Sequence, residues 1–134
     1  MPGKPSPDPQ PPRPTDAELE ILRVLWKRGP SNVREVMEEL NAQSEGSPRA
    51  YTTVLRFLQI MTEKGLVMRT EADRTHIYEP KVPAERTQRQ MVRDLMDRVF
   101  GGSVQDLVLQ ALGARKVSAE ELREIRRLLK EHEK

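Results

Sequence analysis

Apolar residues recur at the spacing of an α-helix in three successive segments of the N-terminal half. The first predicted helix opens with the capping-box sequence Thr15-Asp16-Ala17-Glu18 and stops at Gly29-Pro30. The second runs from about Asn32 to Asn41, and the third runs from about Ala50 to Lys64, before Gly65. The residues predicted to face inward are Leu19, Leu22, Leu25, Trp26, Val33, Val36, Met37, Leu40, Val54, Leu58 and Met61.

Two short strands are predicted after the third helix. Residues Leu66–Glu71 and Thr75–Glu79 alternate imperfectly between apolar and polar side chains, and Ala72-Asp73-Arg74 lies between them as a turn. Three short helices followed by a two-stranded hairpin is the element order of a winged helix-turn-helix. The fold class predicted for the chain is therefore mainly α with a small β-hairpin.

The third helix has a polar face opposite its apolar one, with Thr52 and Arg56 among its members. In a winged helix-turn-helix the N-terminal residues of this helix enter the major groove of DNA, where threonine and arginine can bind base edges or phosphates. The candidate DNA-binding residues, on this helix and on the hairpin, are Arg49, Tyr51, Thr52, Thr53, Arg56, Arg69 and Arg74.

Each of these side chains also has a structural interpretation. Arg56 is by default a solvated residue on an exposed helix face. Thr52 and Thr53 can satisfy backbone amides at the start of the helix. Tyr51 is equally well placed to pack against the second helix, and Trp26 fits a core position better than a stacking platform. His76 and His132 are read as surface residues, because two distant histidines mark neither a metal site nor a catalytic pair.

Three more helices are predicted in the C-terminal part, separated by Gly101-Gly102 and by Gly113. A helical segment of 54 residues, 81–134, is too small to bury a sufficient core alone. Two copies that exchange apolar stripes would bury them and would present two recognition helices to an inverted repeat. The residues predicted to form this dimer interface are Val92, Leu95, Met96, Val99, Leu107, Val108, Leu112, Leu122, Ile125 and Leu129.

Proline marks off a third region. Seven of the 11 prolines of the 134-residue chain fall in residues 1–14, which predicts a disordered, partly polyproline arm. The alternative is a proline-motif ligand for another protein. The predicted domains are thus the arm 1–14, a winged-helix domain 15–80 and a helical dimerisation domain 81–134.

Charge and composition narrow the function classes. The net charge is +2, but residues 15–80 carry nine basic and eleven acidic side chains, whereas 49–76 carry five and three. A purely electrostatic nucleic-acid binder would be more basic than this. The absence of cysteine excludes disulfides and thiolate zinc sites, and no apolar stretch is long enough to span a membrane. We expect a cytoplasmic protein without membrane insertion, metal or cofactor.

Five short motifs follow one another along the chain: TDAELEILRVLW (15–26), NVREV (32–36), AYTTVL (50–55), EKGLV (63–67) and FGGS (100–103). In this order and spacing they resemble the penicillinase-repressor family of bacterial transcription factors (BlaI/MecI/CopY type). The resemblance implies a homodimeric repressor of palindromic operators, often ahead of genes for β-lactamases or copper handling. It also implies control, in many members, by a membrane sensor-protease system. By position, Thr52, Thr53 and Arg56 match the family's recognition-helix region.

The chain departs from the family pattern at three points. The copper-responsive branch relies on C-terminal cysteines, which are absent here. Cleaved members carry an Asn-Phe bond where this chain has Gln110-Ala111, so cleavage by the same protease is not expected. The usual Gly-Arg of the wing turn is Asp73-Arg74.

The leading hypothesis is therefore a dimeric repressor that binds double-stranded DNA. The rival is a protein-interaction module that uses a winged helix without reading DNA sequence, for which the acidic balance of residues 15–80 is the argument. Enzymatic activity is not expected, because the sequence has no cysteine, no glycine-rich phosphate loop and no histidine paired with a nucleophile.

Overall fold

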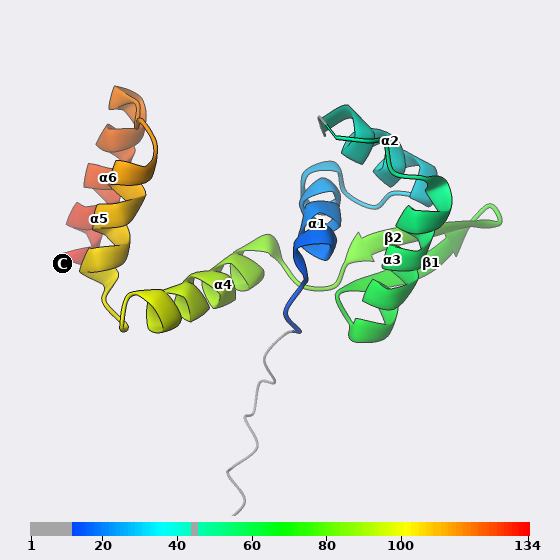
Figure 1. Ribbon diagram of the computed structural model, residues 1–134, viewed down its shortest axis with the longest axis horizontal. Coiled ribbons are helices and arrows are strands. Elements are labelled where there is room, and N and C mark those ends of the chain that lie inside the picture. Colours follow the sequence, from blue (N-terminus) through cyan, green and yellow to red (C-terminus); the bar gives the residue numbers. More distant parts are fainter. Residues whose placement is uncertain (1–11, 44–45) are drawn as a thin grey trace, which may run out of the picture. The chain divides into compact units, whose positions relative to one another are not determined.

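The structure, a computed structural model, describes residues 12–43 and 46–134 (Figure 1). The predicted arm 1–14 therefore lies outside the described residues except for its last three. In the described part, six helices and one antiparallel hairpin confirm the predicted fold class. The elements are α1 (Asp16–Arg28), α2 (Val33–Gln43), α3 (Tyr51–Lys64), β1 (Val67–Ala72), β2 (Thr75–Pro80), α4 (Ala84–Val99), α5 (Val104–Ala114) and α6 (Ala119–His132).

The core of the N-terminal part is built by α1, α2, α3 and the hairpin, which pack around each other as Figure 1 shows. Trp26 lies at its edge, half-buried, and its indole Nε1 donates to the carbonyl of Val82 at 3.1 Å. The indole is thus occupied within the fold and is no stacking platform. The buried members of the core are Ile21, Leu22, Val24, Leu25, Val33, Val36, Leu40, Val54, Leu58, Met61, Leu66, Val67 and Tyr78.

Helix starts are fixed by side-chain caps. Both bonds of the predicted capping box form at α1: Thr15 Oγ1 accepts from the Glu18 amide at 3.3 Å, and Glu18 Oε1 accepts from the Thr15 amide at 2.8 Å. Asn32 and Glu35 make the same reciprocal pair at the start of α2, at 2.8 and 2.9 Å. These caps set the directions in which α1 and α2 leave their turns.

The hairpin is held to the helices through its second strand. Ser31, in the turn between α1 and α2, donates its amide to the Tyr78 carbonyl at 3.0 Å and accepts from the Tyr78 amide at 2.8 Å. The strands pair with Glu71 opposite His76 and Arg69 opposite Tyr78. Helices α1–α3 with this anchored hairpin make a winged helix-turn-helix.

The chain divides into two compact units, one up to Arg89 and one from Gln90 to Lys134. The first therefore extends past residue 80, where the winged-helix domain was predicted to end, because the start of α4 belongs to it and Thr87 is buried there. In the second unit Ser103 and Ser118 cap α5 and α6 through their hydroxyls. Ser118 Oγ accepts from the Glu121 amide at 3.0 Å.

Candidate nucleic-acid interface

Helix α3 is amphipathic, and its polar face points away from the core. Val54, Leu58 and Met61 are fully buried on one side, whereas Thr52 and Arg56 are exposed on the other. The core residues recur every three or four positions, so the positions on the opposite side of the helix face outward. Burial of the apolar stripe therefore orients the polar side chains toward any partner on the open side.

The threonines at the start of α3 are not used as caps. The N-cap is Ala50, which forms no side-chain bond, and its carbonyl accepts from the amides of Thr53 and Val54 at 3.1 Å each. Neither Thr52 nor Thr53 donates or accepts a side-chain hydrogen bond within the described part of the chain. Their hydroxyls are thus available to a ligand.

Arg49 occupies a different place from the other candidates. Its guanidinium binds Glu20 of α1 at 2.5 Å, and its backbone amide and carbonyl bind the Asn41 carboxamide at 2.8 and 3.2 Å. The Asn41 bonds anchor the residue that leads into α3. The structure thus places Arg49 against α1, apart from the outward face of the helix.

The hairpin ends in a two-residue turn whose residues both have positive φ angles. Asp73 has φ 50° and Arg74 has φ 65°, a conformation that closes a tight antiparallel hairpin and that glycine adopts most readily. Arg69 and Arg74 are exposed, one on β1 and one at the turn. In the strand register Arg69 lies opposite the buried Tyr78, whereas Arg74 lies at the tip of the hairpin.

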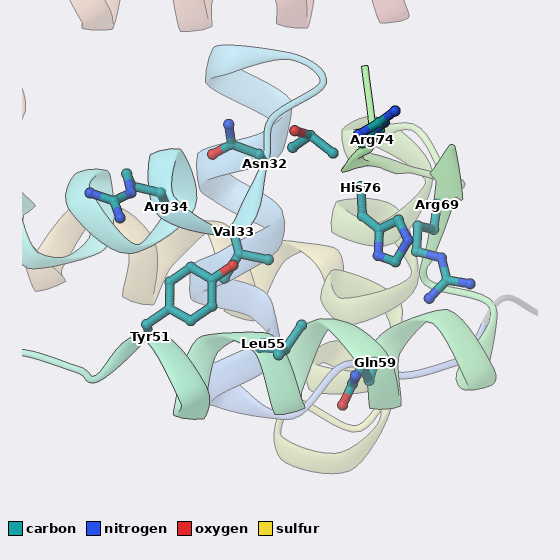
Figure 2. A pocket seen from close by; sticks show the side chains of 10 residues that line it. Asn32, Val33, Arg34, Tyr51, Leu55, Gln59, Arg69, Arg74 and His76 are labelled. Atoms are coloured by element: carbon teal, nitrogen blue, oxygen red, sulfur yellow. The ribbon is translucent and has the colours of Figure 1, made fainter. Parts of the chain in front are cut away.

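A groove of about 570 Å³ lies between the start of α2, one side of α3 and the hairpin. Figure 2 shows Arg34 and Tyr51 at one end of it, and Arg69, His76 and Gln59 at the other. Its basic or titratable residues are contributed by three elements: Arg34 by α2, Tyr51 by α3, and the others by the hairpin. The groove is lined by Asn32, Val33, Arg34, Tyr51, Leu55, Gln59, Arg69, Arg74, Thr75 and His76.

A smaller hollow, of about 400 Å³, lies on α3 and is lined by Thr52, Thr53, Arg56, Phe57 and Ile60. The predicted site residues of α3 are therefore divided between two surfaces: Tyr51 lies in the groove, and the threonines and Arg56 lie in the hollow. The hollow thus combines the threonine hydroxyls and the guanidinium of Arg56 with apolar side chains. Such a surface can donate to base edges and can also contact the methyl group of thymine.

Sequence reasoning missed most of the groove. His76 was expected at the surface and is exposed, but it also lines the groove, together with Arg34 and Gln59. Gln59 carried a signal, because it belongs to the polar face of the third helix. Arg34 and His76 carried none, since only the tertiary approach of α2 to the hairpin brings them to one groove.

Ion pairing divides the basic residues of the N-terminal unit. Lys64 binds the buried carboxylate of Glu18 at 2.6 Å, and Arg28 binds Glu35 at 2.8 Å. Within the described residues, the basic side chains of the groove and the hollow form no ion pair. Some of the acidic side chains of residues 15–80 are therefore neutralised by ion pairs within the fold. The unpaired cations on this face are Arg34, Arg56, Arg69 and Arg74.

The pKa values of two paired carboxylates, Glu18 and Glu35, are lowered by their hydrogen-bond partners. Burial acts to raise the pKa of Glu18, but hydrogen bonds from Lys64 and Thr15 outweigh it and hold that pKa below its ordinary value. The Asn32 amide, with help from Arg28, likewise lowers the pKa of Glu35. Both acids thus remain charged partners of structural cations at neutral pH.

The C-terminal unit offers apolar side chains to its surroundings. No residue from 90 to 134 is buried. Of the ten predicted interface residues, Met96, Leu107, Leu122 and Ile125 are half-buried. The other six are exposed: Val92, Leu95, Val99, Val108, Leu112 and Leu129.

The described residues form neither a metal-binding cluster nor a membrane-spanning helix. Across 12–43 and 46–134, no group of three or more His, Cys, Asp or Glu side chains is arranged to hold a metal ion. Among the helices that the structure describes, none has the length and apolar character needed to cross a membrane.

Comparison with known proteins identifies the family. The family model described as penicillinase repressor matches residues 14–131. The chain belongs to the penicillinase repressor family. Its relatives include the penicillinase repressor of Bacillus licheniformis, which is 31% identical over 121 residues, or 90% of this chain and 92% of that protein. This match confirms the resemblance drawn from the five sequence motifs.

Two further proteins are similar to this chain. The methicillin resistance regulatory protein MecI of Staphylococcus aureus (strain N315) is 23% identical over 115 residues, which are 86% of this chain and 91% of MecI. A solution structure of the Bacillus licheniformis BlaI monomeric form in complex with the blaP half-operator is 32% identical. That match covers 57% of this chain and 89% of the BlaI chain, with a TM-score of 0.46.

Proposed function

We propose that this member of the penicillinase repressor family is a homodimeric transcriptional repressor of the bacterial cytoplasm that binds an inverted-repeat operator. The observation that carries the proposal is the exposed face of α3 and the hairpin, on which Arg56, Arg69 and Arg74 have no acidic partner in the described part of the chain. The similarity of this chain to the penicillinase repressor of Bacillus licheniformis supports the proposal.

In this proposal α3 is the recognition helix. Its 14 residues give a rod of about 21 Å, which fits lengthwise in the major groove. Arg56 grips a guanine through O6 and N7, while Thr52 and Thr53 reach a base edge, a thymine methyl or a phosphate from the first turn. The hairpin arginines contact the sugar-phosphate backbone beside it and fix the register of the helix.

The C-terminal helices supply the second half of the proposal. Exposed Val99 and Leu129 belong to apolar stripes that the unit does not bury by itself. Large exposed apolar patches mark interaction surfaces, and a second copy offers the same stripes in return. Two-fold symmetry then gives two recognition helices for two half-sites of an inverted repeat.

Operator release by cleavage at Gln110-Ala111 is not part of the proposal. The Asn-Phe bond of cleaved family members is absent from these positions, so the sequence supplies no substrate for a sensor-protease of that specificity.

Selection from a pool of random duplexes followed by competition with a scrambled duplex tests the DNA-binding function. We expect a preferred inverted repeat whose affinity falls with added salt. Arg56→Ala is expected to weaken binding by about 1–3 kcal/mol and to relax the preference at one base position of each half-site. Arg23→Ala is the matched control, because Arg23 is an exposed arginine of α1 without an ion pair in the described residues.

Two results would contradict the proposal. Unchanged affinity and preference after replacing Thr52, Thr53 and Arg56 together by alanine would remove α3 as the recognition helix. Equal binding of the selected and scrambled duplexes would favour the protein-interaction module over a repressor.

A further inference from the structure

His76 lies where the hairpin faces α3, at one end of the groove. It is directly opposite Glu71 in the strand register, and Arg69 is its diagonal neighbour on the same face of the hairpin. The same face carries buried Tyr78, so the hairpin turns this side toward the helices. Figure 2 shows the imidazole of His76 and the guanidinium of Arg69 on the hairpin above Gln59 of α3.

The charged groups around His76 are mostly basic. The hairpin contributes Arg69 and Arg74, α2 contributes Arg34, and α3 contributes the uncharged Gln59 together with the phenol of Tyr51. Glu71 is the one carboxylate that the register places beside His76, and no carboxylate is among the residues that line the groove. Within the described chain the three arginines form no ion pair. The described residues that line the groove are therefore basic or uncharged, and Glu71 lies beside them on the hairpin.

We propose that Arg69 and His76, with the carboxamide of Gln59, form a site for a backbone phosphate of DNA, and that protonation of His76 strengthens it. The inference rests on the proposed DNA-binding function and adds a contact and a pH dependence to it. A phosphate fits because it accepts hydrogen bonds at several oxygens while arginine, imidazolium and carboxamide all donate.

The expected consequence is a phosphate contact that depends on the protonation of His76. Histidine is the side chain that ordinarily gains or loses its charge between about pH 5 and pH 8. When the imidazole is protonated, the site presents two cationic donors to the phosphate, and when it is neutral the site presents one. Because a phosphate carries no sequence information, the effect falls on all duplexes alike.

The two histidines of the chain provide a matched pair of variants. His76→Gln keeps a polar side chain at the groove and removes the charge, while His132→Gln makes the same change at the end of α6. His76→Lys keeps a positive charge throughout the range. Binding of a mixed-sequence duplex and of the selected inverted repeat is measured at about pH 6 and about pH 8, where carboxylates stay ionised, at constant ionic strength.

The natural chain and His132→Gln should bind both duplexes about tenfold more tightly at pH 6 than at pH 8, because a dimer gains two exposed ion pairs. His76→Gln should show no such difference. His76→Lys should bind at pH 8 as the natural chain does at pH 6. The salt slope of the natural chain should steepen at pH 6 by about 0.9 per phosphate neutralised.

The opposite results would overturn the inference. An affinity that does not change with pH in the natural chain, or a pH dependence that His76→Gln retains, removes the phosphate contact from His76. If the protein still prefers the inverted repeat, only the role of His76 is contradicted and the proposed repressor function is retained. If the protein binds no duplex at either pH, the proposed repressor function is contradicted as well.

Discussion

The two units of the chain use the same kinds of apolar residue to different ends. The N-terminal unit closes a core of thirteen buried apolar side chains between three helices and a hairpin. The C-terminal unit, from Gln90 onward, forms well-capped helices but buries none of its leucines and valines. A structure can thus complete its helices locally and still lack a core.

The difference indicates what each unit needs. In the N-terminal unit the core fixes α3 and the hairpin, so the exposed face of α3 can be devoted to a partner. In the C-terminal unit the helices require a second apolar surface, which the proposed dimer supplies. Stability of the first should therefore be a property of one chain, and stability of the second should depend on protein concentration.

The largest expected effect comes from opening the N-terminal core. Leu58→Ala removes a fully buried side chain of α3 and should lower the free energy of unfolding of this unit by about 2–5 kcal/mol, because it leaves a cavity. Urea unfolding checks this, with exposed Ile60→Ala on the same helix as the control. If Leu58→Ala changed the dimerisation of the chain without lowering the free energy of unfolding, the two units would not have separate roles.

The matching change in the C-terminal unit is Val108→Asp on α5, where Val108 is 40% exposed. A carboxylate in the proposed interface should raise the dimer dissociation constant by at least about 100-fold, since each dimer loses two buried valines and gains two charges. Sedimentation equilibrium measures this, and Gln110→Asp on the same helix is the control. Equal effects of the two substitutions would remove α5 from the interface.

A smaller effect is expected at the ion pair between Glu18 and Lys64, which joins α1 to α3. The pKa of Glu18 is lowered in the folded chain, so its ionised form adds stability above the unfolded pKa, and that stability is lost as pH falls through the lower folded pKa. Glu18→Gln should therefore cost about 1–2 kcal/mol at pH 7 and progressively less below about pH 4. Thermal unfolding across pH measures the difference. A cost that stays constant down to pH 2 would contradict the ionic origin.

The smallest effect is expected at the wing turn. Asp73→Gly replaces a residue held at φ 50° by one that adopts this conformation freely, and it should stabilise the N-terminal unit by a few tenths of a kcal/mol to about 1 kcal/mol. Arg69→Gly, in the extended strand, is the control and should destabilise it. Loss of stability in Asp73→Gly would show that the Asp73 side chain itself supports the turn.

Local signals predicted most of the fold, because they depend on neighbours in the sequence. The capping box at Thr15, the stop at Gly65 and the turn at Asp73 all lie where the pattern placed them. The burial of Thr87 was not foreseen, since the periodic pattern of apolar residues gives no signal for a buried threonine.

The candidate site was predictable in part for the same reason. The exposed positions of Thr52, Thr53 and Arg56 follow from the period of one helix. The pairing of Arg49 with Glu20 joins residues 29 positions apart, and a single sequence carries no signal for it. His76 likewise enters the groove through the strand register and the approach of α2, which tertiary structure alone determines.

The most direct test of this division is the molar mass of the full chain in solution, measured by light scattering over a range of concentrations. We expect a mass of twice 15.4 kDa at high concentration, with a fall toward 15.4 kDa on dilution. In Val108→Asp the lower mass should persist at concentrations where the natural chain is dimeric. A mass of 15.4 kDa for the natural chain at every concentration would contradict the claim that a second copy completes the C-terminal unit.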